Sequence, residues 1–179
     1  YGQRQEGVQM VRAKLPGGCI TADQMDVIAE CVELYAGRLP TDGTVTEPPE
    51  KVAHVTTRQD IQANFVALED VPAFLRKLDA AGMTTREACG NTVRNVTTCF
   101  LAGRCPAEHA DVTIHARKFA EYFLRHPLAQ QFPRKFKVTF SGCATDCGLS
   151  GMHDIGFIAT HKDGTPGFQV WAAGGLSSQ

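Results

Sequence analysis

Hydrophobic residues at the start of the chain follow a strand pattern and then a helix pattern. Residues 7–18, GVQMVRAKLPGG, alternate and end in Pro-Gly-Gly, which predicts a strand followed by a turn. Residues 21–24 have the form of a capping box that opens a helix. Apolar positions then recur at helical spacing, namely Met25, Ile28, Cys31, Val32 and Tyr35. We expect Cys31 to be a buried core thiol on this helix.

The next segments predict a second strand and a second helix. Residues 39–51 are rich in Pro, Gly, Thr and acidic residues, which is typical of an exposed loop. Residues 52–68 are rich in β-branched residues and predict one strand. Asp70 is expected to cap a short helix that ends near Gly82. Residues 1–84 therefore predict a compact α+β module.

The composition changes after residue 84. Residues 84–106 are dominated by Gly, Asn, Arg and Cys, which indicates a cofactor-binding loop, and residues 112–125 predict a helix. Three predicted strands follow, at residues 135–142, 155–161 and 167–175. Trp171 in the last of them is expected in the core. Residues 85–179 thus form a second predicted module, of α/β type.

Composition narrows the class of protein. The chain has 179 residues, 43% of them hydrophobic, and a net charge of −1, so bulk charge gives no reason to expect nucleic acid or membrane as a partner. No apolar run approaches the ~20 residues that a membrane span needs. Seven cysteines cannot all pair internally, which favours a reducing compartment and a cytoplasmic location. The start at Tyr1 without Met indicates a segment of a longer polypeptide.

Four of the cysteines form two close pairs. Five residues separate Cys99 from Cys105, and three separate Cys143 from Cys147. Four thiolates in two loops are what one 4Fe–4S cluster requires, and the small residues in SGCATDCGLSG let backbone approach a bulky cofactor. A structural zinc site is the alternative, since thiolates also bind zinc, but it more often has two residues within each pair.

Basic residues occur within or beside predicted strands: Arg12, Arg58, Arg94, Arg134, Lys135 and Lys137. The ordinary interpretation of each is a solvated strand face. Lys135 and Lys137, however, are two residues apart and would share a face, and their strand runs directly to Cys143. We therefore expect the two ammonium groups to neighbour the cluster, where cations bind a small oxyanion and supply protons. Spacing alone does not place Arg12 and Arg94 with them.

At these motifs the chain resembles the sulfite/nitrite reductase haemoproteins, which carry sirohaem and a 4Fe–4S cluster. The signature is SGCATDCGLSGMHDIGF, with Cys143, Cys147 and Asp154, and further matching segments are YGQRQEGVQMVRAKLPGG, HVTTRQDIQ, ACGNTVRNVTTCFLAG and FPRKFKVTFSG, in the family's order. The resemblance implies a ferredoxin-like module at 1–84 followed by a sirohaem/4Fe–4S-binding α/β module at 85–179.

The resemblance also implies roles for individual residues. Cluster ligands would be Cys99, Cys105, Cys143 and Cys147, and Cys147 would also bridge to the sirohaem iron. The oxyanion would be held by Arg12, Arg94, Lys135 and Lys137. Sirohaem contacts would come from Arg58 and Gln62, with Asn91 and Thr92 as further candidates.

The function implied is six-electron reduction of sulfite to sulfide or of nitrite to ammonia, with electrons from an external donor such as ferredoxin or a reductase subunit. Family enzymes usually combine two such halves, with the substrate cations and the cysteines on different halves. This chain carries both sets, so it would pair with a copy of itself or with a second half. The alternatives are a non-catalytic electron-transfer protein and a structural subunit of such an assembly. The choice between sulfite and nitrite stays open.

Overall fold

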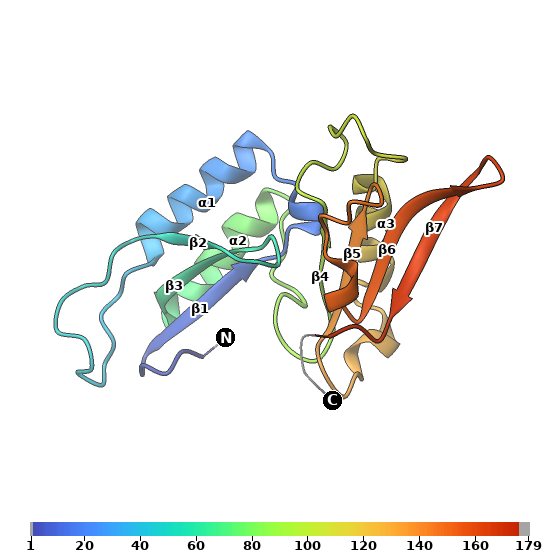
Figure 1. The fold of residues 1–179 in the computed structure, drawn as a ribbon. Coiled ribbons are helices and arrows are strands. Elements are labelled where there is room, and N and C mark those ends of the chain that lie inside the picture. The colour runs from blue at the N-terminus through green and yellow to red at the C-terminus, as the bar shows by residue number, and fades with distance from the viewer. Residues whose placement is uncertain (1, 176–179) are drawn as a thin grey trace. The chain divides into compact units, whose positions relative to one another are not determined.

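The computed structural model describes residues 2–175 (Figure 1). The chain forms two compact units. The first comprises the chain up to Leu15 together with Ile20–Ala88, and the second comprises Pro16–Cys19 and the chain from Cys89 onward. The chain thus visits the second unit briefly before completing the first. The division at residues 84 and 85 that the sequence predicts stays a prediction.

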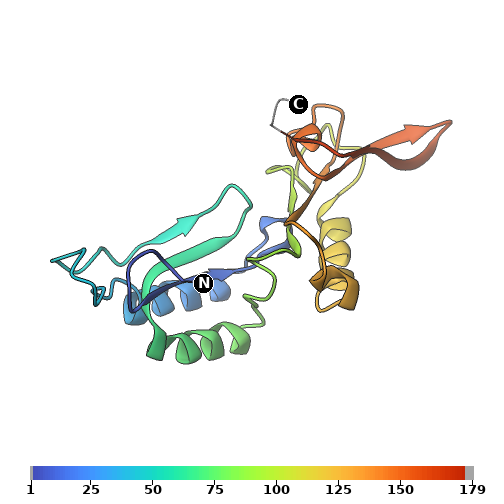
Figure 2. The ribbon, with the colours of Figure 1, turned by 90° about the horizontal axis from the view of Figure 1, so that it is seen from below.

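Three strands and two helices build the first unit. They are β1 (Val8–Ala13), α1 (Ala22–Tyr35), β2 (Ala53–Val55), β3 (Ile61–Ala67) and α2 (Val71–Ala80). The strands form an antiparallel sheet in the order β1-β3-β2. Both helices lie along the same face of this sheet (Figure 2). The other face is therefore free of helices in this unit.

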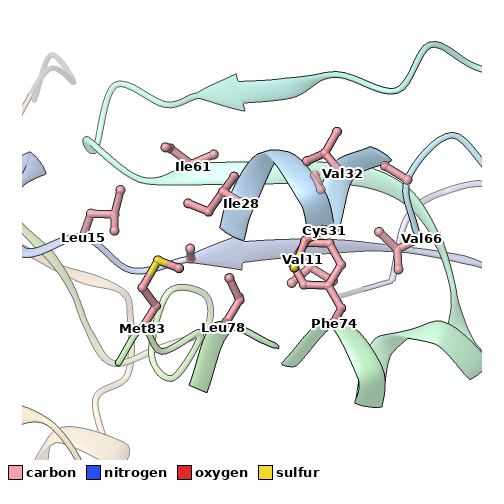
Figure 3. Packing of buried hydrophobic residues seen from close by; sticks show 13 residues of the cluster. Val11, Leu15, Ile28, Cys31, Val32, Ile61, Val66, Phe74, Leu78 and Met83 are labelled. Atoms are coloured by element: carbon pink, nitrogen blue, oxygen red, sulfur yellow. The ribbon is translucent and has the colours of Figure 1, made fainter. Parts of the chain in front are cut away.

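The core of the first unit lies between that sheet and its two helices. Figure 3 shows Ile28, Cys31 and Val32 of α1 directed toward the side chains of the strands and of α2. Cys31 is fully buried, as expected, and burial raises the pKa of its thiol. Met25 is 44% exposed, so its expected place on the inner face is wrong. It lies on the same helix but outside the core.

The helix ends test the predicted caps. Thr21 forms the expected capping box with Gln24, because the Thr21 hydroxyl accepts from the Gln24 backbone and the Gln24 side chain accepts from the Thr21 backbone. Asp70 precedes α2 but makes no side-chain capping bond. Its carboxylate instead accepts two bonds from Arg38. The predicted capping role of Asp70 is therefore wrong.

The single strand expected over residues 52–68 is two strands joined by a turn. The Thr56 hydroxyl accepts bonds from the backbone of Arg58 and Asp60, and Gln59 has a positive φ of 58°. A hydroxyl that satisfies turn amides competes with continued strand pairing. The hairpin β2–β3 results, with Arg58 in its turn.

The second unit contains a mixed sheet. Its elements are a short 3₁₀ segment η1 (Pro16–Gly18), β4 (Val93–Thr98), α3 (Thr113–Phe123), η3 (Pro127–Gln130), β5 (Phe136–Ser141), η4 (Ser150–Met152), β6 (Ile155–Lys162) and β7 (Thr165–Ala172). The strand order is β4-β5-β6-β7, with β4, β5 and β6 parallel and β7 antiparallel to β6. Helix α3 packs on one face through Ala116 and Ala120.

Strand β4 falls in the segment expected to be a loop, so that expectation is wrong for residues 93–98. Its Asn95, Thr97 and Thr98 side chains are buried, and the Thr97 hydroxyl donates to Thr139 of β5 at 2.9 Å. Parallel pairing with β5 therefore places a strand of polar sequence inside the sheet. The helix predicted at 112–125 is confirmed as α3.

The last two predicted strands pair as an antiparallel hairpin. Asp163 and Gly164 both have positive φ, which suits a two-residue hairpin turn. Trp171 is 49% exposed, because almost all of β7 is exposed. Its expected core position is wrong. Among residues 2–175 no helix has the length and apolar character needed to span a membrane.

Candidate functional site

The cysteine loops start at the carboxyl ends of two neighbouring parallel strands. Cys99 directly follows β4, and Cys143 lies two residues beyond β5. The Cys99 backbone N–H donates to the Phe140 carbonyl at 2.9 Å, which continues the strand pairing into the loop. Parallel strands bring their carboxyl ends to one edge, where open α/β sheets place their ligand sites. The two cysteines are therefore brought together by the sheet.

Three of the four predicted ligands lie close together. Cys147 and Cys143 are both near enough to the Cys99 thiol to affect its pKa. Burial is the main cause that raises the pKa of the Cys99 thiol, and Cys147 and Cys143 act in the same direction, against a backbone bond at Leu101. None of the seven cysteines is in a disulfide. These thiols are thus free for a metal centre.

The loop that carries Cys105 is folded back onto the second cysteine loop. His109 donates its backbone N–H to the carbonyl of Gly142 at 2.7 Å. A Cβ on Gly142 would lie 3.0 Å from the Cβ of Glu108, so the two loops pack closely at this glycine. The carboxylate of Glu108 in turn accepts the Gly103 N–H at 2.9 Å. The loop of Cys105 is thereby fixed beside Cys143.

Within residues 2–175 no three His, Cys, Asp or Glu side chains are arranged to hold one metal ion. A zinc ion needs four ligand atoms within ~2.3 Å of a single point. The corner irons of a 4Fe–4S cluster each take a different cysteine, so their sulfurs are farther apart. The four cysteines offer the thiolate donors that either metal centre uses.

The basic residues of the second unit gather at the opposite, amino ends of the same strands. Arg94 is the second residue of β4, Lys137 is the second residue of β5, and Lys135 directly precedes β5. Thr92 accepts the Phe136 N–H at 2.9 Å through its backbone carbonyl. The Asn91 amide donates to the Pro133 carbonyl at 3.3 Å. All five predicted residues of this unit outside the cysteine loops therefore lie at one edge.

The expectation that the lysines neighbour the cysteines is wrong. Strand β5 has six residues, so at about 3.3 Å per residue its ends are roughly 17 Å apart. Lys137 is at the start of this strand, and Cys143 lies beyond its end. Lys137 and Cys143 are close in sequence but far apart in space, because the extended strand β5 runs from the amino edge of the sheet to its carboxyl edge.

The first unit brings two predicted residues into contact. Arg12 of β1 and Gln62 of β3 are direct cross-strand partners. The Gln62 side-chain oxygen accepts from Nε of Arg12 at 3.1 Å and from Nη2 at 2.8 Å, and Nη1 donates to the Ala88 carbonyl at 3.1 Å. Arg58 lies in the β2–β3 turn and is half-buried. The guanidinium of Arg12 is thus held in one orientation.

Comparison with known proteins shows the family to which the chain belongs. The family model of the nitrite and sulphite reductase 4Fe-4S domain matches residues 89–179, and that of the nitrite/sulfite reductase ferredoxin-like half domain matches residues 1–41. The chain belongs to the nitrite and sulfite reductase family. The predicted fold class, a ferredoxin-like module followed by a 4Fe–4S module, is confirmed.

Individual members of the nitrite and sulfite reductase family match nearly the whole chain. A ferredoxin–nitrite reductase of Leptolyngbya laminosa is 32% identical over 97% of the chain. An assimilatory ferredoxin-dependent nitrite reductase of Haloferax mediterranei is 33% identical over 98%. A sulfite reductase [ferredoxin] of Mycolicibacterium paratuberculosis is 30% identical over 94%. The chain spans only 32%, 30% and 28% of these relatives.

Solved structures agree with this assignment. The Mycobacterium tuberculosis NirA protein matches with a TM-score of 0.81 and 28% identity, over 95% of this chain and 29% of that one. Dissimilatory sulfite reductase I matches with a TM-score of 0.68 and 18% identity, over 87% of this chain and 34% of that one, which shows the fold alone.

One acidic residue of the site has no counterpart among the sequence predictions. Asp146, between Cys143 and Cys147, accepts hydrogen bonds from Ser141 and Ser150. Its position between two ligand cysteines was visible in the sequence, but only the fold shows that the two serines, before and after the cysteines, converge on it. The bonds of Asp146 with Ser141 and Ser150 thus shape the loop that carries the two proposed ligands Cys143 and Cys147.

Proposed function

We propose that this chain is the cofactor-binding half of a sirohaem- and 4Fe–4S-dependent reductase that converts sulfite to sulfide or nitrite to ammonia. The observation that carries the proposal is the convergence of Cys99, Cys143 and Cys147 at the carboxyl edge of β4 and β5. The family supports the reaction class. The relatives include both nitrite and sulfite reductases, so the choice between the two anions is left to experiment.

The cluster would be held by Cys99, Cys105, Cys143 and Cys147. The donor set fits, since three of these thiols already lie close together and the loop of Cys105 is bonded to Gly142 next to Cys143. Only the thiolate is a ligand, so each cysteine would lose its proton as iron binds.

Sirohaem contacts are proposed for Arg58, Gln62, Asn91 and Thr92, with Cys147 shared between the two cofactors. The fit has a structural basis at Thr92, whose hydroxyl oxygen is buried without a hydrogen-bond partner among the described residues. A buried orphan hydroxyl is costly unless a ligand satisfies it. When bound, the sirohaem and the cluster would relay the six electrons from the external donor to the anion.

The chain's own part in the reaction is to hold and protonate the anion. We propose that Arg12, Arg94, Lys135 and Lys137 bind the oxyanion oxygens, since guanidinium and ammonium groups make strong charge-assisted bonds. Arg12 suits this role because Gln62 and Ala88 fix its orientation. A guanidinium has five N–H groups, so three such bonds leave donors for an anion. The lysines would supply protons to the departing oxygens.

The separation of cysteines and cations along β5 bears on assembly. We propose that the basic set and the cysteines of this chain serve two different sirohaems, so that the working site needs a second half or a second copy. A ferredoxin or reductase subunit would be the donor, and the protein would work in the cytoplasm. The relatives' greater length leaves room for such a second half within one polypeptide.

The decisive experiment is steady-state reduction of sulfite and of nitrite by the purified full-length protein under anaerobic conditions, with a chemical donor. Visible absorption in the same sample tests for sirohaem. Turnover with sirohaem bands supports the proposal. Cluster absorption without sirohaem would favour an electron-transfer protein, and sirohaem without turnover would favour a structural subunit.

A further inference from the structure

The carboxylate of Asp146 is the centre of a hydrogen-bond network in the second cysteine loop. Its Oδ1 accepts from the Ser141 hydroxyl at 2.6 Å and from the Ser150 hydroxyl at 2.7 Å. The Ser150 backbone N–H donates to Oδ2 at 2.8 Å and to Oδ1 at 3.1 Å. Ser141 ends β5 and Ser150 begins η4, and both are buried. One side chain therefore closes the loop that contains Cys143 and Cys147.

The network extends to the residue after Cys147. The Ser141 hydroxyl, while donating to Asp146, accepts the Gly148 N–H at 3.0 Å. The Gly148 carbonyl accepts from the Thr139 hydroxyl at 3.1 Å. A Cβ on Gly148 would lie 2.6 Å from the Ser141 hydroxyl oxygen and 2.9 Å from that of Thr139. The backbone on both sides of Cys147 is thus fixed to β5.

The loop conformation needs this support. Asp146 and Leu149 have left-handed backbone, with φ of 50° and 55°. This conformation is unfavourable for a side chain such as that of Leu149 and less so for Asp146. Hydrogen bonds to a charged group are stronger than those between neutral groups, and more than one of these bonds ends on the Asp146 carboxylate. The carboxylate therefore holds the loop in a shape that it would otherwise leave.

We propose that Asp146 is the positioning residue of the cluster: it fixes the Cys147 thiolate, and its negative charge lowers the reduction potential of the cluster. The proposal deepens the proposed function and rests on its cluster. A carboxylate next in sequence to a ligand opposes the gain of an electron, and net charge and hydrogen bonding are among the factors that set cluster potentials. Mutation of a residue that orients a metal ligand typically lowers metal affinity by about 10–100-fold.

The test uses the full-length protein, reconstituted anaerobically with iron and sulfide, and two variants at this position. Asp146→Asn keeps the shape and removes the charge, whereas Asp146→Ala removes both. Asp163→Asn is the matched control, since Asp163 also has left-handed backbone (φ 51°) but lies in the β6–β7 turn. Redox titration followed by electron paramagnetic resonance gives the cluster potential, and a chelator gives the rate of iron release.

We expect Asp146→Asn to keep its iron and to raise the potential. Asp146→Ala should release iron about 10–100-fold faster. Asp163→Asn should match the wild type in both. A wild-type potential in Asp146→Asn, or wild-type iron release in Asp146→Ala, would overturn the proposal.

A cluster-free measurement separates this proposal from the proposed function. If the wild type binds no iron, the proposed function and the tuning of a potential both fail, but the fixing of the loop can still be measured by amide hydrogen exchange. The N–H groups of Gly148 and Ser150 should lose protection in Asp146→Ala and keep it in Asp163→Asn. Equal protection in both variants would contradict the positioning role.

Discussion

The two ends of strands β4 and β5 carry their proposed functional residues in different ways, on hydrogen-bonded loops at one end and on the strands at the other. At the carboxyl end the proposed ligands lie in loops fixed by hydrogen bonds. His109 of the first loop is bonded to Gly142 of the second, and Ser150 is bonded to Asp146 within the second. At the amino end the proposed anion-binding residues, such as Arg94 and Lys137, project from the strands themselves. A resident cofactor needs a rigid frame, whereas a substrate that enters and leaves needs charge on side chains that can adapt.

The largest expected effect is at the carboxyl end. Cys143→Ser should lose most of its cluster iron, because each cluster corner needs a thiolate. Cys19→Ser is the control: this thiol is exposed, and we assign it no ligand role. Iron and sulfide per chain after anaerobic reconstitution are the measurement. Full iron content in Cys143→Ser would remove this cysteine from the ligand set.

A change at the amino end should leave iron unaffected and weaken substrate binding. Lys137→Gln should raise the dissociation constant for sulfite or nitrite by about 10–100-fold, since a hydrogen bond to a charged group is worth about 1.5–3 kcal/mol. Lys118→Gln on the exposed side of α3 should have no such effect. If Lys137→Gln also lost iron, the two ends would not be independent.

The rigidity of the carboxyl end can be tested with one methyl group. Gly148→Ala should lower the free energy of unfolding by about 1–3 kcal/mol, because the new Cβ would collide with the Ser141 hydroxyl oxygen at 2.6 Å. Gly167→Ala in β7 is the control, since a Cβ there meets nothing within 4 Å. Urea unfolding of both variants gives the difference. Equal stability would mean that the loop can move aside.

The smallest expected effect concerns acid stability of the segment that links Cys105 to α3. The Thr113 hydroxyl and backbone N–H both donate to Asp111, which lowers the pKa of this carboxyl below 3.8. A lowered folded-state pKa contributes stability above the unfolded pKa, and this contribution is lost as the pH falls through the folded value. Asp111→Asn should therefore make unfolding less dependent on pH below about 4, as acid titration of the circular dichroism would show. If Asp111→Asn unfolded in acid with the same pH dependence as the wild type, the proposed contribution of Asp111 to acid stability would be contradicted.

Local signals in the sequence were reliable where one segment decides its own structure. The capping box at Thr21 and the helical spacing over α1 each depend on neighbours in sequence, and the structure contains the predicted helix. The closeness of Cys99 to Cys143 and Cys147 comes instead from the pairing of β4 with β5. The family signature around these cysteines supplied the fold class.

Features that depend on a distant partner were missed. Strand β4 is polar in sequence, and its place in the sheet beside β5 buries Asn95 and Thr97, with the Thr97 hydroxyl bonded to Thr139. The exposure of Trp171 follows from the place of β7 at the edge of the sheet. The distance from Lys137 to Cys143 follows from strand direction, which sequence spacing does not convey.

The early excursion of Pro16–Cys19 into the second unit has a consequence for how this protein can be divided. Gly17 accepts a bond from the Thr98 hydroxyl at 3.1 Å, at the end of the strand that leads to Cys99. A cut between the two units at residue 88 would remove this support from the second of them. A protein that receives the whole second unit, in the laboratory or in evolution, therefore needs two separate segments, Pro16–Cys19 and the chain from Cys89 onward.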